Sequence, residues 1–157
     1  MISRFPLILL LASIALAAPS LADPPEVQVY KSPTCGCCNE WISHLRDNGF
    51  TVSSTDVPDV MPIKHENGVP HHLGACHTAL VGGYVVEGHV PAEAVRELLR
   101  ERPPVAGLTV PGMPIGSPGM EGPNPERYKV FSFGAGGVKV FSEHQGNATP
   151  PPKKPGS

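Results

Sequence analysis

The chain has 157 residues and a formal net charge of −2, from 12 lysines and arginines against 14 aspartates and glutamates. This slightly acidic balance excludes the basic surface by which proteins bind nucleic acids or anionic membranes, so we expect neither partner. The length suits a single domain. Prolines and glycines, 20 and 17 in number, gather in the second half, which predicts a compact domain followed by a turn-rich extension.

Residues 1–22 have the pattern of a secretory signal peptide. Arg4 precedes an almost entirely apolar run from Phe5 to Ala18, and small residues end the segment at Ala22. The run is too short for a membrane span of roughly 20 residues. We therefore expect cleavage after Ala22, export of the protein, and no membrane span in the mature chain.

Residues 23–102 carry alternating strand and helix patterns. The expected elements are, in chain order, a strand at 27–30, a helix that follows a cysteine cluster and ends at 48–49, a strand at 50–57, a short helical segment that ends at 67–68, strands at 78–81 and 84–86, and a helix that begins at Pro91. Gly82-Gly83 predicts a tight hairpin between the last two strands. The order β-α-β-(α)-β-β-α, with cysteines at the start of the first helix, predicts an α/β fold of the thioredoxin-like kind.

The second half of the chain predicts a different kind of structure. In residues 103–145 the tripeptide Pro-Gly-Met occurs twice, at 111–113 and 118–120, which indicates loop rather than helix. Two β-rich runs at 129–133 and 138–141, joined by glycines, predict a closing hairpin that packs on the domain. Residues 146–157 are rich in proline and lysine and predict a disordered tail.

The four cysteines form a cluster of three, Cys35, Cys37 and Cys38, with Cys76 far away in the sequence. Cysteines that staple a small secreted domain are usually scattered and close long loops. Adjacent cysteines can hardly satisfy disulfide geometry with each other. The spacing therefore favours a functional site. In a thioredoxin-like fold, Cys76 would lie beside the cluster, because it comes just before the third expected strand.

Cys35 and Cys38 form a Cys-x-x-Cys pair at the expected start of a helix. Free amide groups and the helix dipole favour the thiolate there, which is the arrangement of a disulfide oxidoreductase. One hypothesis is therefore a thiol–disulfide oxidoreductase in which Cys35 and Cys38 are catalytic. Cys37 argues against it, because a third thiol offers every mixed disulfide a wrong partner.

A metal site gains from the third thiol. Four thiolates match Cu(I), Zn(II) or an iron–sulfur cluster. A zinc-stabilised interaction module is one alternative, although zinc sites of this kind usually contain a second Cys-x-x-Cys pair, which the chain lacks. Copper is favoured by the additional soft and borderline donors of the sequence, which are His71, His72, His77, His89, Met113 and Met120.

Three segments, CGCC, GACHTALVGGYVVEGHVP and GLTVPGMPIGSPGMEG, resemble those of the CopG family, periplasmic proteins of copper-resistance systems. The resemblance extends from about Val27 to Phe141. It implies a thioredoxin-like fold, a periplasmic location, and copper bound by the four cysteines at positions 35, 37, 38 and 76. It also implies a role in interconverting copper redox states, with copper-resistance proteins or an electron donor as partners.

Several residues keep two interpretations at this point. We expect a resting disulfide between Cys35 and Cys38, and Cys37 and Cys76 are candidates for a second one. His77 is either an auxiliary ligand or a structural residue at the start of a strand, and His89 is expected to make a local polar contact to backbone. Met113 and Met120 are auxiliary copper ligands or, as we favour, packing residues.

Overall fold

The computed structural model describes residues 25–148. The predicted signal peptide at 1–22 and residues 149–157 of the predicted disordered tail (146–157) lie outside the described residues. At the start of that tail, Gly146 is buried, and the amides of Gly146 and Asn147 donate hydrogen bonds to the carbonyl oxygens of Glu126 and Gly116. Within them the chain forms a mixed α/β structure, and no helix is both long and apolar enough to cross a membrane. The elements are β1 (Val27–Lys31), α1 (Gly36–Asp47), β2 (Val52–Asp56), α2 (Met61–Glu66), a 3-10 turn η1 (His71–Leu73), β3 (His77–Val81), β4 (Tyr84–Gly88), α3 (Ala92–Glu101), β5 (Gly107–Val110), β6 (Arg127–Phe133) and β7 (Lys139–Gln145).

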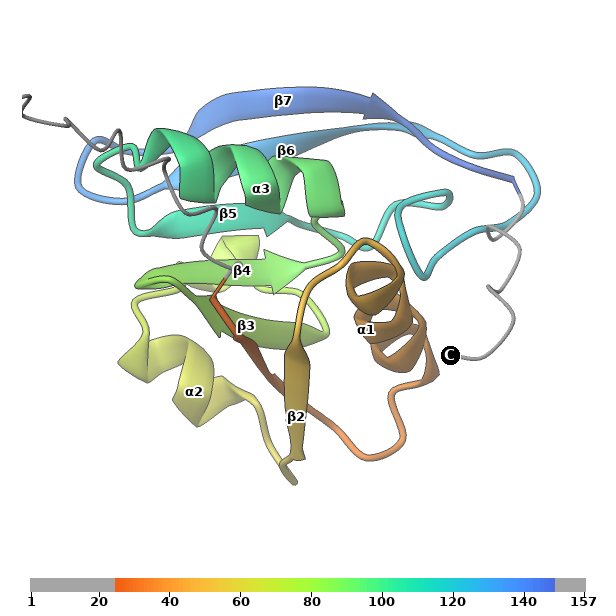
Figure 1. The fold of residues 1–157 in the computed structure, drawn as a ribbon, viewed down its shortest axis with the longest axis horizontal. Helices are drawn as coiled ribbons and strands as arrows, with labels where there is room; N and C mark the ends of the chain where they lie inside the picture. The colour runs from red at the N-terminus through yellow and green to blue at the C-terminus, as the bar shows by residue number, and fades with distance from the viewer. Residues whose placement is uncertain (1–24, 149–157) are drawn as a thin grey trace, which may run out of the picture.

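All seven strands form one sheet, in the order β2-β1-β3-β4-β5-β6-β7. β1 is parallel to β2 and antiparallel to β3, and β3 and β4 form an antiparallel hairpin. β5 lies parallel to β4, and β6 and β7 continue the sheet by antiparallel pairing. Figure 1 shows α1 and α3 on one side of this sheet and α2 on the other.

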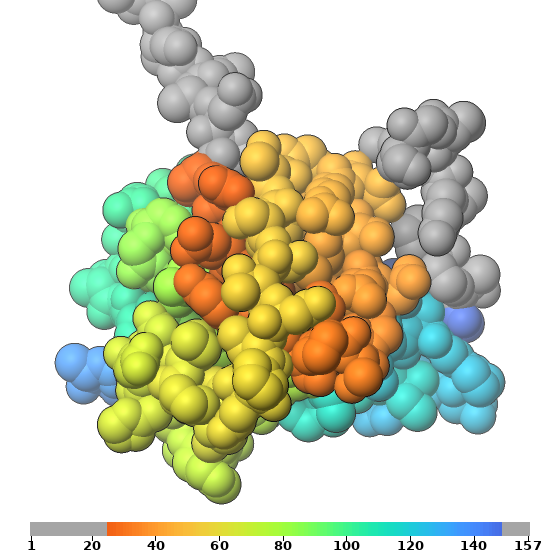
Figure 2. All heavy atoms as spheres, turned by 90° about the horizontal axis from the view of Figure 1, so that it is seen from below, coloured from red at the N-terminus to blue at the C-terminus, as the bar shows by residue number. Residues whose placement is uncertain are grey.

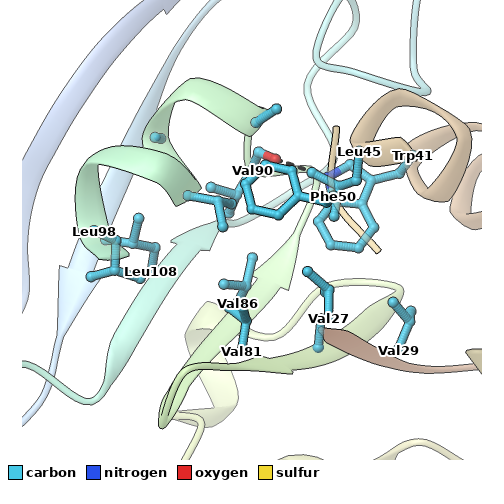
Figure 3. Packing of buried hydrophobic residues seen from close by; sticks show 14 of the residues in the cluster. Val27, Val29, Trp41, Leu45, Phe50, Val81, Val86, Val90, Leu98 and Leu108 are labelled. Atoms are coloured by element: carbon cyan, nitrogen blue, oxygen red, sulfur yellow. Dashed lines mark hydrogen bonds between the residues drawn. The ribbon is translucent and has the colours of Figure 1, made fainter. Parts of the chain in front are cut away.

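The larger core lies between the sheet and the two helices α1 and α3. α1 contributes a buried stripe that includes Trp41, Ile42 and Leu45, spaced so that they share one face of the helix. The indole nitrogen of Trp41 donates a hydrogen bond of 2.8 Å to the carbonyl oxygen of Val90 (Figure 3). This bond satisfies the buried N–H and joins α1 to the segment that leads into α3.

A smaller core covers the opposite face of the sheet. Val69 and Leu73, from the segment that joins α2 to β3, pack there with Val85 and Phe133. The segment just before Cys76 is therefore held against the sheet by apolar contacts.

The sequence predicted no strand between residues 103 and 128, and this was wrong, because β5 lies there. Gly107 begins this strand, and a Cβ at this position would lie 2.0 Å from the carbonyl oxygen of Val85. Glycine at this position therefore allows β5 to approach β4. The closing hairpin is present with longer strands, and it joins the domain by continuing the main sheet beyond β5.

Candidate metal centre

The cysteine cluster lies at the tip of α1. Cys35 is the residue that precedes the helix and has extended backbone (φ −78°, ψ 93°), and Cys37 and Cys38 lie in the first turn. A disulfide joins Cys35 to Cys38, with a Cα–Cα distance of 5.4 Å, which confirms the expected resting bridge. Cys38 is fully buried, whereas Cys35 and Cys37 are half-buried.

Cys76 lies beside the cluster, immediately before β3. The sulfur atoms of all four cysteines lie within 4.8 Å of one another. The central expectation from the sequence, that folding brings the distant sulfur to the other three, is thus met by the geometry. Cys37 and Cys76 are free thiols, so the second disulfide that the sequence left open is not formed.

A buried charged network fixes the backbone in front of Cys76. The amide of Ala75 donates a hydrogen bond of 2.6 Å to Oε1 of Glu87, whose side chain is fully buried in β4. Lys64, from α2, makes an ion pair with Glu87 and a hydrogen bond of 3.0 Å to Thr78. The hydroxyl of Thr78 donates to the second carboxylate oxygen of Glu87 at 2.7 Å.

This network was missed in the sequence, where Lys64 and Glu87 look like ordinary surface charges. Burial raises the pKa of Glu87, and the neighbouring Lys64 cation opposes that shift. A buried charge is tolerated only when it is paired and hydrogen-bonded. Lys64 and Glu87 meet both conditions, because they pair with each other and each also makes a hydrogen bond to another group. The network therefore holds Ala75, and with it the position of the Cys76 sulfur, relative to the sheet.

Two buried histidines contact the Cys76 sulfur. Nδ1 of His77 lies 3.3 Å from Sγ of Cys76, and Nε2 of His89 lies 3.1 Å from it. Burial lowers the pKa of both histidines, so both rings are neutral around pH 7. Burial, together with the nearby Cys37, raises the pKa of the Cys76 thiol to about 12. A metal that binds this sulfur must therefore displace a proton.

The Pro/Gly-rich segment closes the site through its backbone. The carbonyl oxygen of Pro118 lies 2.7 Å from Nδ1 of His89. Gly119 (φ +84°) packs so tightly on α1 that a Cβ would lie 2.7 Å from the carbonyl oxygen of Cys37 and from the amide nitrogen of Trp41. In Figure 2 the orange atoms of the segment that leads into α1 lie beside the cyan atoms of the segment after β5.

The other donors singled out in the sequence lie in several places. Met113 is 39% exposed and Met120 is half-buried, and it is the backbone between them that reaches His89. His71 and His72 are exposed on the 3-10 turn. His89, for which the sequence predicted a local contact to backbone, instead contacts the backbone of Pro118, 29 positions later, and also faces Cys76. The Gly88-His89-Val90-Pro91 stretch gave no signal for the second contact, because the sulfur comes from a different segment.

The donor set of this pocket is rich in sulfur. Four thiolates become available when the Cys35–Cys38 disulfide is reduced, and two imidazole nitrogens lie next to one of them. Thiolate clusters bind soft metal ions such as Cu(I), and imidazole suits borderline ions such as Zn(II) and Cu(II). The pocket can therefore hold a metal, and its donor set changes with the redox state of Cys35 and Cys38.

Comparisons with known proteins agree with this chemistry. A family model described as a protein of unknown function, DUF411, matches residues 73–120. No curated protein sequence matches the chain. Two solved structures of copper resistance protein CopG are similar to it: Form 2 has 42% identity, covers 77% of this chain and 98% of its own, and has a TM-score of 0.73. Form 1 has 43% identity, covers 78% of this chain and 99% of its own, and has the same TM-score of 0.73. On this similarity, which spans nearly the full length of both structures, the chain belongs to the family of copper resistance protein CopG.

Proposed function

We propose that this protein is a periplasmic copper-binding protein of copper resistance, and that its reduced form holds Cu(I) with the thiolates of Cys35, Cys37, Cys38 and Cys76. The observation that carries the proposal is the convergence of four sulfur atoms within 4.8 Å of one another. Thiolates are the protein ligands that Cu(I) prefers. The pattern of residues 1–22 supports export through a cleaved signal peptide.

We also propose that the core is thioredoxin-like. The strand order β2-β1-β3-β4, with β3 antiparallel to its neighbours, supports this assignment. So do the placement of α1 and α3 on one face of the sheet and the disulfide at the tip of α1. Such a scaffold presents a Cys-x-x-Cys pair at a helix start, which suits redox chemistry at Cys35 and Cys38.

The disulfide gives the site a way to change the oxidation state of copper. Closure of the Cys35–Cys38 bond releases two electrons and two protons, which is the electron count for reducing two Cu(II) ions to Cu(I). The reverse reaction opens the bond, takes up two protons and oxidises two Cu(I) ions. We propose this interconversion as the redox activity of the protein, with copper as substrate.

Anaerobic titration of the fully reduced protein with Cu(I), in competition with a Cu(I) chelator of known affinity, tests the binding proposal. We expect tight uptake by the wild type and at least a tenfold loss of affinity in Cys76→Ser and Cys37→Ser, because each substitution removes one thiolate. The control is Ser54→Ala, an exposed position on β2, which should bind copper like the wild type. If Cys37→Ser and Cys76→Ser bind Cu(I) as tightly as the wild type, the four-thiolate site is wrong.

A thiol–disulfide oxidoreductase is the second candidate, and the Cys35–Cys38 disulfide with its buried Cys38 favours it. The two functions make opposite predictions for Cys37. An oxidoreductase that acts on proteins should keep its disulfide-exchange rate in Cys37→Ser and lose it in Cys35→Ser. Measuring disulfide exchange and Cu(I) affinity on the same variants therefore separates the two.

A further inference from the structure

We propose that the disulfide form of this protein has its own metal site, in which Cys76, His77 and His89 bind one borderline divalent cation such as Zn(II) or Cu(II). The proposal deepens the proposed function and rests on it in treating the pocket as a copper site. The ligand atoms of these three residues lie within 4.8 Å of one another. Cys76 therefore belongs to two donor sets, one made of sulfur alone and one that mixes sulfur with nitrogen.

The orientation of His89 favours coordination. A carbonyl oxygen only accepts hydrogen bonds, so Nδ1 of His89 must donate to Pro118 at 2.7 Å. In the neutral ring this leaves a lone pair on Nε2, the atom that faces the Cys76 sulfur at 3.1 Å. A ring nitrogen held by a backbone carbonyl while the other nitrogen is free is the usual arrangement of a metal-binding histidine.

His77 places a second imidazole nitrogen beside the Cys76 sulfur. Its side chain is fully buried, with Nδ1 3.3 Å from the Cys76 sulfur. Its Nε2 has no hydrogen-bond partner among residues 25–148. Coordination through Nδ1 places the ring proton on Nε2, so the distance from Nδ1 to the Cys76 sulfur, and not the unpartnered Nε2, favours His77 as a ligand. The ring is held between Trp41, at a centroid distance of 4.3 Å, and His89, at 5.2 Å.

The redox state of the α1 tip decides which donor set is complete. With the Cys35–Cys38 disulfide closed, two of the four sulfurs can no longer act as thiolates, and Cu(I) loses half of its soft ligands. Cys76 and the two imidazoles are unaffected by that bond. The Cys76 thiolate and two nitrogens, with a fourth position that the free thiol of Cys37 can reach, make a ligand set that Zn(II) and Cu(II) accept. Reduction of the disulfide therefore switches the pocket from a mixed site to a thiolate site.

Titration of the oxidised full-length protein with Co(II) under argon tests this. Co(II) is the probe because it replaces Zn(II), does not oxidise thiols, and shows ligand-field and thiolate charge-transfer bands when bound. We expect one Co(II) per chain with a sulfur charge-transfer band. His89→Ala and His77→Ala should each weaken binding at least tenfold, and Cys76→Ser should weaken both Co(II) binding and the charge-transfer band. The control is His65→Ala, an exposed histidine of α2, which should leave the titration unchanged.

Two results would overturn the proposal: an oxidised wild type that gives no thiolate band with Co(II), or a band that both histidine variants leave intact. If the variants fail to fold, X-ray absorption of the Zn(II)-loaded oxidised wild type decides instead. A shell containing nitrogen and sulfur supports the mixed site, and a shell without sulfur overturns it. Cu(I) titration of the reduced wild type runs in parallel. If it succeeds while Co(II) binding fails, only this inference falls, whereas failure of the Cu(I) titration removes the proposed function.

Discussion

The two halves of the metal pocket are built in different ways. One half, Cys35 to Cys38, comes from four consecutive residues at the tip of α1, and a disulfide closes it. The other half comes from three separate segments. The first contributes Cys76 and His77, the second His89, and the third Pro118. The first half needs only a helix start. The second depends on the pairing of β3 with β4, on a buried ion pair, and on the segment after β5.

This contrast shows where the pocket is vulnerable. Substitutions that disturb packing far from the sulfurs should displace Cys76 and the histidines while the helix tip keeps its disulfide. Stability measurements and metal titrations on the same variants can therefore separate the two halves.

Lys64→Met should have the largest effect on stability. It leaves the Glu87 carboxylate buried without its cation, and breaking a buried pair in this way costs about 3 to 5 kcal/mol in the free energy of unfolding. Urea denaturation of the oxidised protein measures the loss. Cys76 should also react faster with alkylating reagents, because Glu87 no longer holds Ala75 in one position.

The matched control is Lys129→Met. Lys129 pairs with Glu143 at 3.2 Å, but both side chains are more than half exposed, so its loss should cost less than about 1 kcal/mol. A Lys64→Met protein as stable as this control would show that the charged network does not hold the assembled half of the pocket.

Gly119→Ala should come next in size. Its φ of +84° and the 2.7 Å approach to the backbone of Cys37 and Trp41 leave no room for a methyl group. We expect the free energy of unfolding to fall by about 2 kcal/mol. Part of this loss comes from alanine in a left-handed backbone conformation, and part comes from displacement of the segment after β5. Thermal unfolding measures the change, and the Co(II) affinity of the oxidised form should fall because Pro118 no longer orients His89.

Gly136→Ala provides the control for this prediction, because no atom lies within 4 Å of the added Cβ. Equal stabilities of the two variants would mean that the segment after β5 yields easily and does not fix the pocket.

His44 should give the smallest effect, and a pH-dependent one. Its Nε2 accepts a hydrogen bond of 3.1 Å from the amide of Ala92, so it ties α1 to the first residue of α3. Burial lowers the pKa of His44 below its ordinary value of 6.5, although Glu93, Glu121 and Asp47 act in the opposite direction and Arg96 acts in the same one. His44 therefore binds a proton more readily in the unfolded chain than in the folded one. The contribution of neutral His44 to the stability of the fold is lost as pH falls below 6.5.

Denaturation curves at pH 7.5 and 5.5 test the His44 contribution. His44→Gln should flatten the loss of stability on acidification by up to about 1 kcal/mol relative to the wild type. His77 and His89 contribute with the same sign and are present in both proteins, so the difference isolates His44. The exposed His65→Gln should follow the wild-type curve, and a His44→Gln curve that also follows it would contradict the assignment.

The local half of the pocket was predictable from the sequence because its signals are local. The helical spacing of Cys38, Trp41 and Leu45 and the turn at Gly82-Gly83 report backbone geometry directly, and the structure confirms both. The neighbourhood of Cys76 could also be anticipated, but only from the order of strands expected in a known kind of fold.

What the sequence did not predict depends on contacts between distant segments. β5 was missed because Pro103 and Pro104 shortly before it indicate a loop, and only the approach of Gly107 to Val85 explains the strand. The burial of Lys64 depends on Glu87, which comes 23 residues later. The contact of His89 with Cys76 has no local pattern at all, since the two residues are 13 positions apart and a hairpin lies between them.

The position of Trp41 has a practical consequence. It is the single tryptophan of the chain, and its ring lies 4.3 Å from that of His77, between the helix tip and the histidine side of the pocket. Tryptophan emission from the native protein therefore originates beside the metal ligands. An ion that quenches this emission reports its own arrival optically, without a label, in both the oxidised and the reduced protein.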